Sequence, residues 1–547
     1  MRKIYFAVLA LLVFHTATAQ LFTGQVIDKS TNEPIAYAQV YFPELKAGTV
    51  TNMKGEFKLE HDTPKKLHIQ ISYVGYESID EVINTESKKK MQFYLKQSHY
   101  QLKEVVVSVP DGKLQGDNVV SVDHKKIASL QRTAPITLAE AISSIPGIDQ
   151  NTTGAGIGKP VIRGLTGNRI VTYAQGIRVE NQQWGDEHGL GVGEVGIESV
   201  EVIKGPASLL YGADAMGGVL FFIDERYANE NTIEAKAKTS FLSNTLGSIN
   251  HLGFKIHKGP LKLNLFGGYS TQADYKVPNG KRVFNSRFDE KNMKIALGFN
   301  TKNLVSNLRY SYLENDFGIV DSNIYSESNN REFELPFQNI VNHSISLQNT
   351  LYTGESKTSL TLGYTHNYRQ EFEEQTNHPA LGLKLGSFTY NLNWHSPVYK
   401  NIFDFVIGSQ GMIQSNVNNG EEILIPDAES KDFGAFGLLN IDLEKLTFQT
   451  GIRFDNRNIN TKTTGHIQEF SHNYQGITYS AGAVYRLHKF KLRGNVSSGF
   501  RAPTSSELLS DGVHEGTIRY EKGNRDLNHE NATQFDLSVD FQSKHFH

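Results

Sequence analysis

From Ile233 onward, apolar and polar residues alternate with a period of two in one segment after another. In the stretch KLTFQTGIRFDNR, aliphatic, aromatic or β-branched residues occupy alternate positions, and the residues between them are mostly polar or small. The first set is Leu446, Phe448, Thr450, Ile452 and Phe454, and the second is Lys445, Thr447, Gln449, Gly451, Arg453 and Asp455. Because successive side chains of a strand point to opposite faces, this pattern predicts β-strands with one apolar face.

The same alternation recurs in KLNLFGGYS and in TYSAGAVYRL. The apolar face is formed by Leu261, Leu263, Leu265 and Tyr269 in the first stretch and by Tyr479, Ala481, Ala483, Tyr485 and Leu487 in the second. Counting such segments predicts about 12–14 strands in residues 229–547. Alternation with interspersed glycine and aromatic residues is typical of an antiparallel transmembrane β-barrel. A soluble propeller or sandwich would also alternate, although no blade-length repeat is present.

The first residues predict export of the protein. Arg2 and Lys3 precede an apolar run from Ile4 to Phe14, and Ala17-Thr18-Ala19 matches the small-residue pattern of a cleavage site. Residues 1–19 are therefore predicted to be a secretory signal peptide that is cut before Gln20. The alternative is a buried N-terminal helix, because the apolar run is too short to span a bilayer.

Two different regions precede the alternating segments. Residues 20–98 contain short strand-like runs at regular spacing, separated by turn signals such as Lys54-Gly55, and predict a small β-sandwich of the seven-strand type. Residues 115–228 have a mixed pattern that predicts an α+β domain. A short helix in TLAEAISSIPGI is expected to begin after Thr137 as its N-cap and to stop at Pro146-Gly147. Strands interrupted by glycine-rich turns follow it.

Between these regions, residues 99–114 form a short extended tract and linker. Three valines, Val105 to Val107, favour a strand that Pro110 and Gly112 would end. This strand could be an edge of the sandwich or a plain linker. It could also be held out for another protein to pair with by β-augmentation.

Two regions resemble known families. The opening GQVIDKSTNEPIAYAQV and the strand SYVGYES make residues 20–98 similar to the carboxypeptidase regulatory-like domain, which is non-catalytic in its family. The helix ending Ile145-Pro146-Gly147, the IRG tripeptide and the run VEVIKGPASLLYGADAMGGV make residues 115–228 similar to the plug domain of TonB-dependent outer-membrane receptors. The structural motif of that plug corresponds here to Arg163, Gly164, Gly205, Pro206, Tyr211, Gly212, Gly217 and Gly218.

The receptor resemblance implies an architecture and a location. The fold would be mainly β: a sandwich, a plug, and a transmembrane barrel in the outer membrane, with the N-terminal domain in the periplasm. The stretches GFRAPTSSELL and KGNRDLNHENATQFDLSVDF resemble late-middle barrel segments of the family. Since the family barrel has about 22 strands, about 12–14 strands would make this chain an N-terminal portion of a longer receptor, with an incomplete barrel.

The same resemblance implies active import driven by the periplasmic protein TonB. The tract before the plug would then be the TonB box, whose pairing residues are Leu102, Lys103, Glu104, Val105, Val106 and Val107. Outer-membrane lipid is the second expected partner. Nucleic acid is not expected, because 55 Lys and Arg against 58 Asp and Glu leave a net charge of −3.

The stretch NQQWGDEHGLG, Asn181 to Gly191, is the candidate cargo loop. Asp186, Glu187 and His188 could converge on one cation, and an imidazole with carboxylates suits zinc or copper(II). Trp184 could stack on an organic ligand or pack against the barrel wall. The alternative is an ordinary solvent-facing turn. Further ligands would have to come from barrel histidines.

The predicted cargo is therefore a metal ion, zinc or copper, or a metal chelate, and no resident cofactor is expected. A ferric siderophore, haem or cobalamin is the alternative. A surface adhesion protein is disfavoured by the plug and TonB-box motifs. An enzyme is disfavoured because the chain lacks cysteine and an H-E-x-x-H motif.

Overall fold

The computed structural model describes residues 20–29, 32–45, 47–61, 66–73, 76, 78–84, 91–96, 119–181, 189–320, 324–326, 329–400, 402–443, 445–514 and 519–541. The chain forms two compact units, Met1–Glu104 and Val105–His547. The described helices include none that is long and apolar enough to cross a membrane.

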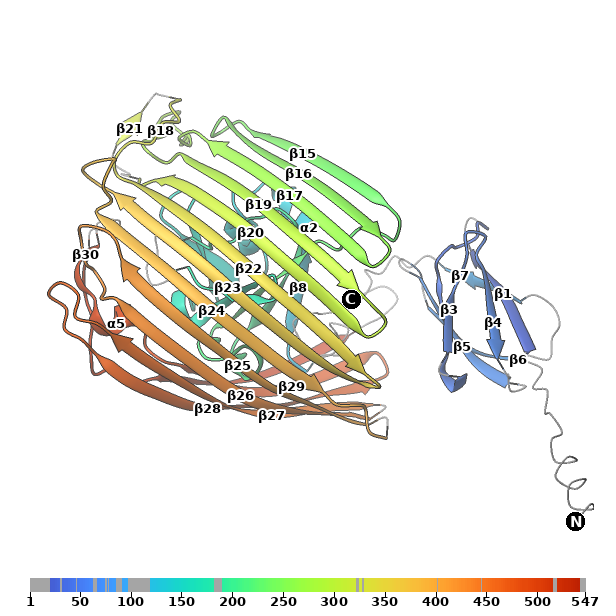
Figure 1. Ribbon diagram of the computed structural model, residues 1–547. Coiled ribbons are helices and arrows are strands. Elements are labelled where there is room, and N and C mark those ends of the chain that lie inside the picture. Colours follow the sequence, from blue (N-terminus) through green and yellow to red (C-terminus); the bar gives the residue numbers. More distant parts are fainter. Residues whose placement is uncertain are drawn as a thin grey trace, which may run out of the picture. The chain divides into compact units, whose positions relative to one another are not determined.

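The first unit is a β-sandwich of seven described strands (Figure 1). The strands are β1 (Gln20–Asp28), β2 (Gln39–Phe42), β3 (Ala47–Val50), β4 (Glu56–His61), β5 (Lys66–Ser72), β6 (Ile79–Asn84) and β7 (Met91–Leu95), with a 3-10 turn η1 (Pro43–Leu45). One sheet has the order β4-β1-β7 and the other β3-β2-β5-β6. Phe42, Phe57, Leu67 and Ile69 are fully buried between them. The predicted sandwich is confirmed.

The second unit begins with an α+β domain. A five-stranded sheet has the order β12-β11-β14-β13-β8, and β9 and β10 form a separate hairpin. The strands are β8 (Val122–Lys126), β9 (Ile148–Thr152), β10 (Gly158–Ile162), β11 (Ile170–Ala174), β12 (Ile177–Val179), β13 (Ile197–Lys204) and β14 (Gly218–Asp224). The helical segments are α2 (Ile127–Leu130), η4 (Gln131–Thr133), α3 (Leu138–Ser143), η5 (Gly167–Arg169) and α4 (Ser208–Tyr211).

The predicted helix start is confirmed, and the predicted stop is too late. The Thr137 side chain accepts a hydrogen bond from the backbone N–H of Glu140, as an N-cap does. The helix α3 ends at Ser143, because Ser144 already closes the last turn by donating to Ala141 and Ile142. Pro146-Gly147 lies in the turn that follows.

Fourteen antiparallel strands then form one large sheet that wraps around this domain (Figure 1). They are β15 (Ile233–Leu242), β16 (Gly247–Lys258), β17 (Leu261–Gln272), β19 (Phe288–Asn300), β20 (Leu304–Gly318), β22 (Phe337–Thr353), β23 (Ser356–Phe372), β24 (Leu381–His395), β25 (Phe403–Asn418), β26 (Ala428–Leu443), β27 (Leu446–Thr461), β28 (Ser471–Leu487), β29 (Phe490–Arg501) and β32 (Glu530–Phe541). Among the described residues the sheet is open, with β15 and β32 at its edges.

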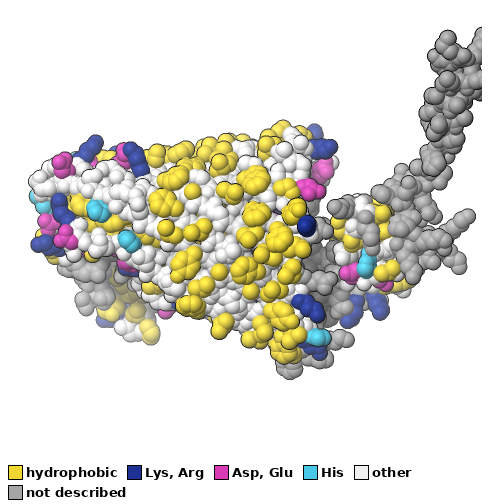
Figure 2. Space-filling model, turned by 90° about the horizontal axis from the view of Figure 1, so that it is seen from below, with side chains coloured by type: hydrophobic (Ala, Val, Ile, Leu, Met, Phe, Trp, Pro, Cys, Tyr) yellow, Lys and Arg dark blue, Asp and Glu magenta, His cyan; other side chains and the backbone are white. Residues whose placement is uncertain are grey.

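The predicted alternation is confirmed along these strands. On β27, Ile452 and Phe454 are exposed on the outer face, whereas Arg453 and Asp455 are buried on the inner face. Figure 2 shows hydrophobic side chains spread over the outer surface of the sheet, with charged side chains gathered toward its ends. This is the arrangement that a lipid-facing barrel wall requires.

The two ends of the sheet differ in their connections. At one end the strands are joined by short turns such as 259–260, 301–303 and 354–355. At the other end they are joined by long loops such as 273–287, 319–336 and 502–529. These loops carry the paired short strands β18 (Arg282–Val283) with β21 (Tyr325–Ser326) and β30 (Asp511–His514) with β31 (Arg519–Lys522), and the helix α5 (Ser505–Leu509). Because such barrels have short periplasmic turns and long extracellular loops, the long-loop end is the outer end.

Candidate functional site

The outer part of the interface between the inner domain and the sheet holds a cavity. It is lined by residues of β11, β12 and the turn after α4 on one side. The other side is formed by β24–β27 and by Pro503 to Ser506 at the start of α5. This cavity is here called the outer cavity. A molecule bound in it would contact both the inner domain and the sheet.

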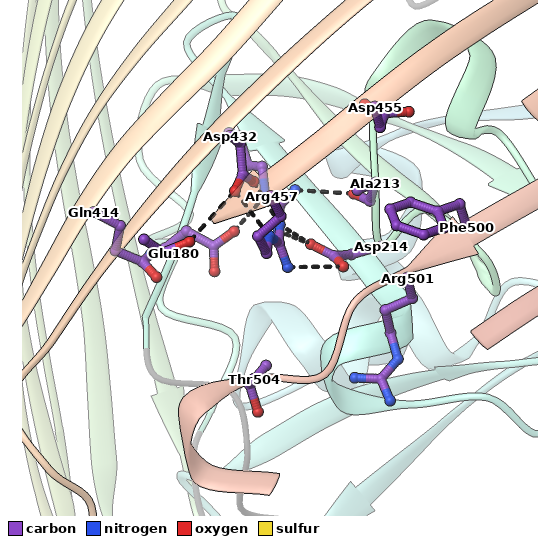
Figure 3. Close-up of polar contacts among 12 residues, drawn as sticks. Glu180, Ala213, Asp214, Gln414, Asp432, Asp455, Arg457, Phe500, Arg501 and Thr504 are labelled. Atoms are coloured by element: carbon purple, nitrogen blue, oxygen red, sulfur yellow. Dashed lines mark hydrogen bonds and ion pairs between the residues drawn. The ribbon is translucent and has the colours of Figure 1, made fainter. Parts of the chain in front are cut away.

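A buried ion-pair network forms one side of the outer cavity, around Asp214 (Figure 3). The guanidinium of Arg457 on β27 lies 2.7 Å from an Asp214 carboxylate oxygen and 2.5 Å from Asp432 on β26. Arg178 on β12 lies 2.8 Å from Asp214 and also pairs with Glu180. The network thus joins three carboxylates and two guanidinium groups across the interface.

The backbone places Asp214 in this position by a sharp turn. Gly212 ends α4 with a φ of 84°, and Asp214 itself has a φ of 79°, a conformation that aspartate tolerates better than most residues. The backbone N–H of Asp214 donates to Phe500 O on β29 at 2.8 Å, and Arg178 donates to Ala213 O at 3.0 Å. The turn is therefore held from both sides.

The charges determine the ionisation of this cluster. Burial opposes ionisation of Asp214, but Arg457 and Arg178 outweigh it and hold the pKa of Asp214 below its ordinary value. Burial likewise opposes the charged form of Arg178, and the neighbouring carboxylates Glu180 and Asp214 nevertheless raise its pKa. Both groups are charged at neutral pH.

The remaining lining of the outer cavity is neutral. Asn416 on β25 is 5% exposed and lines the cavity, and neither its amide nitrogen nor its oxygen has a partner in the protein. Gln414 and Thr504 add polar groups, and Met412 and Ile425 add apolar surface. A buried amide without partners is costly unless a ligand or water satisfies it. The site is suited to a solute with hydrogen-bonding groups.

A second set of ion pairs joins the inner domain to β29 and β32. Arg169 forms two hydrogen bonds with Glu530, at 2.9 and 2.6 Å. Arg501 also pairs with Glu530 and holds Glu507 of α5 at 2.7 Å. Arg163 lies 3.3 Å from Asp536. These contacts connect the cavity-lining helix α5 to the inner domain.

The two sequence-predicted functional segments lie outside the described residues. They are the cargo-loop residues Trp184, Asp186, Glu187 and His188 and the TonB-box residues Leu102, Lys103, Glu104, Val105, Val106 and Val107. The flanks of the loop are described: Asn181 is buried, and its side-chain amide donates to Gly189 O at 2.9 Å.

The predicted plug-motif residues occupy turns and contacts of the inner domain. Tyr211 packs edge-on against Tyr173, with ring centroids 5.2 Å apart. Gly218 begins β14 and Gly217 directly precedes it. Gly205 approaches the side chain of Gln534 on β32 so closely that a Cβ atom would clash with it. Arg163 and Gly164 both have positive φ in the turn after β10, and Pro206 precedes α4.

None of the barrel histidines that the structure describes lines the outer cavity. His343 and His366 are neighbours on β22 and β23, with ring centroids 6.4 Å apart, and His343 contacts the hydroxyl of Tyr310 at 2.9 Å. They share the outer face of the sheet with the exposed Ile345. Across the described ranges, no three His, Asp or Glu side chains are arranged to hold a metal ion.

The residues that line the outer cavity are not among those that the sequence motifs single out. Asp214 lies inside the GADA part of the recognised motif, so its position could have been noticed. Arg457, Asp432 and Asn416 lie on inward positions of strands, where the alternation predicts their direction but not which of them meet.

Comparisons with known proteins agree with this architecture. Residues 238–547 match the family model of the TonB dependent receptor-like β-barrel, residues 115–219 match the TonB-dependent receptor plug domain, and residues 22–107 match the CarboxypepD_reg-like domain. The chain therefore belongs to the TonB-dependent receptors, which are outer-membrane proteins, and its N-terminal domain and plug are those of this family.

Two curated relatives are similar over part of their length. The "Probable TonB-dependent siderophore receptor PirA" of Acinetobacter baumannii is 23% identical over 415 residues, which cover 63% of this chain and 52% of that protein. The "Vitamin B12 transporter BtuB" of Photobacterium profundum is 31% identical over 102 residues, 18% of this chain and 17% of that protein. The chain thus spans about half the length of the first of these relatives.

Solved structures share the fold at low identity. The "Copper transporter OprC" superposes with a TM-score of 0.64 at 16% identity, covering 81% of this chain and 71% of that chain. The siderophore receptor PirA from Acinetobacter baumannii superposes with a TM-score of 0.62 at 17% identity, covering 77% and 68%.

Proposed function

We propose that this receptor imports a scarce metal-bearing solute across the outer membrane, with energy supplied by TonB. The outer cavity is the observation that carries this proposal. It opens at the long-loop end, and its lining is shared between plug and barrel. A bound solute would therefore change the strength of the contacts between plug and barrel. A transporter whose gate responds to its cargo requires such a coupling.

The chemistry of the outer cavity favours a metal chelate, because its lining combines polar amide and hydroxyl groups with apolar side chains. The unpartnered amide of Asn416 suits a neutral donor or acceptor group on the cargo. Relatives named for siderophores and for vitamin B12 carry large chelates, and this agrees with the proposal.

A bare zinc or copper ion is the second candidate. It is favoured by the composition of the cargo loop, which places Asp186, Glu187 and His188 in adjacent positions. The fold similarity to a copper transporter is consistent with it without choosing the metal.

The energy would arrive through the tract from Leu102 to Val107. An extended valine-rich strand can pair with a strand of TonB through main-chain hydrogen bonds. Because the outer membrane stores no ATP, pulling on this tract is the expected source of work. The expected role is transport, without a bond-making step.

The test is binding by the receptor in detergent, with zinc chloride, copper chloride, ferric hydroxamate and ferric catecholate siderophores, haemin and cyanocobalamin as probes. We expect one chelate to bind stoichiometrically, and Asn416→Leu to weaken its binding about tenfold, since one satisfied buried amide is worth about 1–1.5 kcal/mol. Ser415→Leu is the matched control, because Ser415 is the exposed neighbour on the other face of β25.

His188→Ala separates the two candidates. Loss of stoichiometric zinc or copper in this variant, with no chelate bound by the wild type, would replace the chelate by a bare metal ion. If none of the probes binds, the proposed cargo class is wrong. Uptake into cells should in addition disappear with Val106→Pro, which removes a backbone donor from the pairing tract.

A further inference from the structure

Three cavities lie in series along one side of the plug. The outer cavity reaches Val179 on β12. The other side of Val179 borders a smaller cavity, here called the middle cavity. Val195 separates the middle cavity from a third, larger space, here called the inner chamber. Two valine side chains are thus the only residues common to successive cavities among the lining residues described.

The inner chamber lies toward the periplasmic end of the receptor. It is lined by Glu225 to Tyr227 and Asn229, which precede the first barrel strand, and by residues of β15, β16 and β17. Its walls are charged: Glu225 lies 3.1 Å from Lys236 and 2.7 Å from Lys255. A polar solute that reached this chamber would be solvated by these groups and close to the exit.

The middle cavity is polar in spite of its burial. Gln175, at the tip of the β11–β12 turn, is 2% exposed, and both polar atoms of its side chain lack a partner in the protein. The oxygen of Asn292 and the nitrogen of Asn342 also line this cavity without partners. Three buried amides with free hydrogen-bonding atoms are costly in a static core. They are suited to transient contacts with a solute or its water shell.

The barrier between the middle cavity and the inner chamber is a glycine-rich segment, residues 189–196, here called the glycine segment. It is neither helix nor strand. One end is held by the Asn181 amide on Gly189 O, and the other by Glu225 N–H on Gly196 O at 2.9 Å. Val179, in contrast, belongs to β12 and is paired with Thr172 of the plug sheet.

The glycine segment closes the route by lying directly on the barrel wall. A Cβ atom added at Gly193 would lie 3.2 Å from the Cβ of Asn292 on β19, and one added at Gly196 would lie 2.6 Å from the ring of Phe266 on β17. Only glycine permits this approach at Gly196, which also has a φ of 67°. Besides these backbone contacts, the Val195 side chain packs against Gly268 on β17. The segment belongs to no strand, so it can separate from the wall without breaking the strand pairing of the plug sheet.

We propose that the cargo leaves the outer cavity along the β17–β20 wall, through the middle cavity and into the inner chamber, and that the glycine segment is the gate that moves. This proposal rests on the proposed import function. The alternative is that the plug leaves the barrel or unfolds as a whole, in which case no single segment acts as the gate.

The first test uses engineered disulfides, for which this cysteine-free chain provides a clean background. Gly193→Cys with Asn292→Cys joins the gate to β19, because the 3.2 Å separation of the Cβ positions is close to the roughly 3.5–4.5 Å of a disulfide. Pro206→Cys with Gly499→Cys is the matched control. Its Cβ positions are 3.3 Å apart, and it joins the plug to β29, away from the route.

We expect the oxidised gate pair to bind cargo and to lose uptake, with uptake restored by reduction, whereas the oxidised control pair continues to import. Loss of uptake in both oxidised pairs would show that the whole plug must move, and uptake by the oxidised gate pair would also overturn the proposal. If the wild type binds and imports none of the six probes above, the proposed function itself fails.

A second measurement does not depend on the cross-link geometry. Val195→Cys is buried at the gate, and Ala141→Cys is buried in α3 of the plug. During energised uptake we expect a membrane-impermeant thiol reagent, supplied from the periplasmic side, to label the Val195 position at least about tenfold faster than at rest, as local opening predicts. Labelling of the Ala141 position should not change, and equal acceleration at both positions would contradict a local gate.

Discussion

The plug contacts the barrel in two physically different ways. Around Asp214, five charged side chains form a buried network across the interface, with distances of 2.5–2.8 Å between paired atoms. Along the glycine segment, the backbone lies on the wall and cavities flank it on both sides. The first contact involves charges that cannot be separated without a large desolvation penalty, whereas the second involves weak apolar contacts.

This difference indicates that the two regions of the plug have different roles. The Asp214 network lies beside the outer cavity, where cargo can act on it, and keeps the plug in register with the wall. The glycine segment lies between the cavities and is free of such charges except at Glu194. We therefore expect perturbations of the network to destabilise the whole plug, and perturbations of the segment to act locally.

Asp214→Asn should have the largest effect. Asparagine tolerates the positive φ of this position, so the substitution removes mainly the negative charge between Arg457 and Arg178. Removing one partner of a buried ion pair typically costs about 3–5 kcal/mol, and the cost here should lie at the lower end of that range because Arg457 keeps Asp432 and Arg178 keeps Glu180. The expected result is a lower midpoint of denaturant unfolding and a plug that is cleaved faster by protease.

Asp455→Asn is the control for this prediction. Asp455 pairs with Arg453 at 2.8 Å on the same strand, so its loss breaks a buried ion pair without crossing the interface. We expect the Asp455 variant to lose stability without faster cleavage of the plug. If protease cleaves the plug equally fast in both variants, the Asp214 network does not differ from other buried ion pairs in holding the plug in place.

Gly196→Ala should have a smaller, local effect. The added methyl group meets Phe266 at 2.6 Å in a backbone conformation that alanine disfavours, which together cost about 2–4 kcal/mol. Gly259→Ala has a similar φ of 58° but open space around the new Cβ, so it reports the backbone strain alone. Amide hydrogen exchange should increase in residues 189–196 of the first variant only. Exchange that increases throughout the plug sheet would contradict a separable segment.

The sequence predicted the architecture better than the interface. Period-two alternation on strands such as β27 directly records which side chains face lipid, because the bilayer acts on every residue of the outer face. The motif from Val200 to Val219 likewise located the plug turn that carries Asp214. The pairing of Asp214 with Arg457, 243 positions later in the chain, depends on how the plug docks, and no local pattern encodes it.

The same limit applies to the gate. In a sequence, a run of glycines such as the one after His188 most often signals a turn. The close approach of Gly193 to Asn292 and the cavities on both sides depend on the wall, which the sequence of the plug does not describe. The roles of Trp184, Asp186, Glu187 and His188 stay predictions.

The smallest expected effect is the pH dependence of gate opening. It tests the difference between the Asp214 network and the glycine segment through one carboxyl group. Burial raises the pKa of Glu194 to about 7; Lys238 and Lys236 on β15 oppose the shift, and Glu290 on β19 adds to it. His251 on β16 lies 3.9 Å from the same carboxyl group, and Gln131 donates a hydrogen bond to it.

A carboxyl group whose pKa is raised in the closed state stabilises that state when it is protonated. This contribution is complete below the ordinary pKa of about 4.5 and is lost as the pH rises through about 7. The closed gate should therefore open more often at pH 8 than at pH 5.5, by roughly 25- to 30-fold if the opened carboxyl group regains its ordinary pKa.

Hydrogen exchange of residues 189–196, corrected for its intrinsic pH dependence, measures this opening. In Glu194→Gln the side chain is neutral at every pH, so the increase between pH 5.5 and 8 should disappear while the fold persists. The Asp214 network should show no change over this range, because the lowered pKa of Asp214 places its loss of charge at acid pH. If the opening still depends on pH in Glu194→Gln, another titratable group causes the effect and Glu194 does not control the gate.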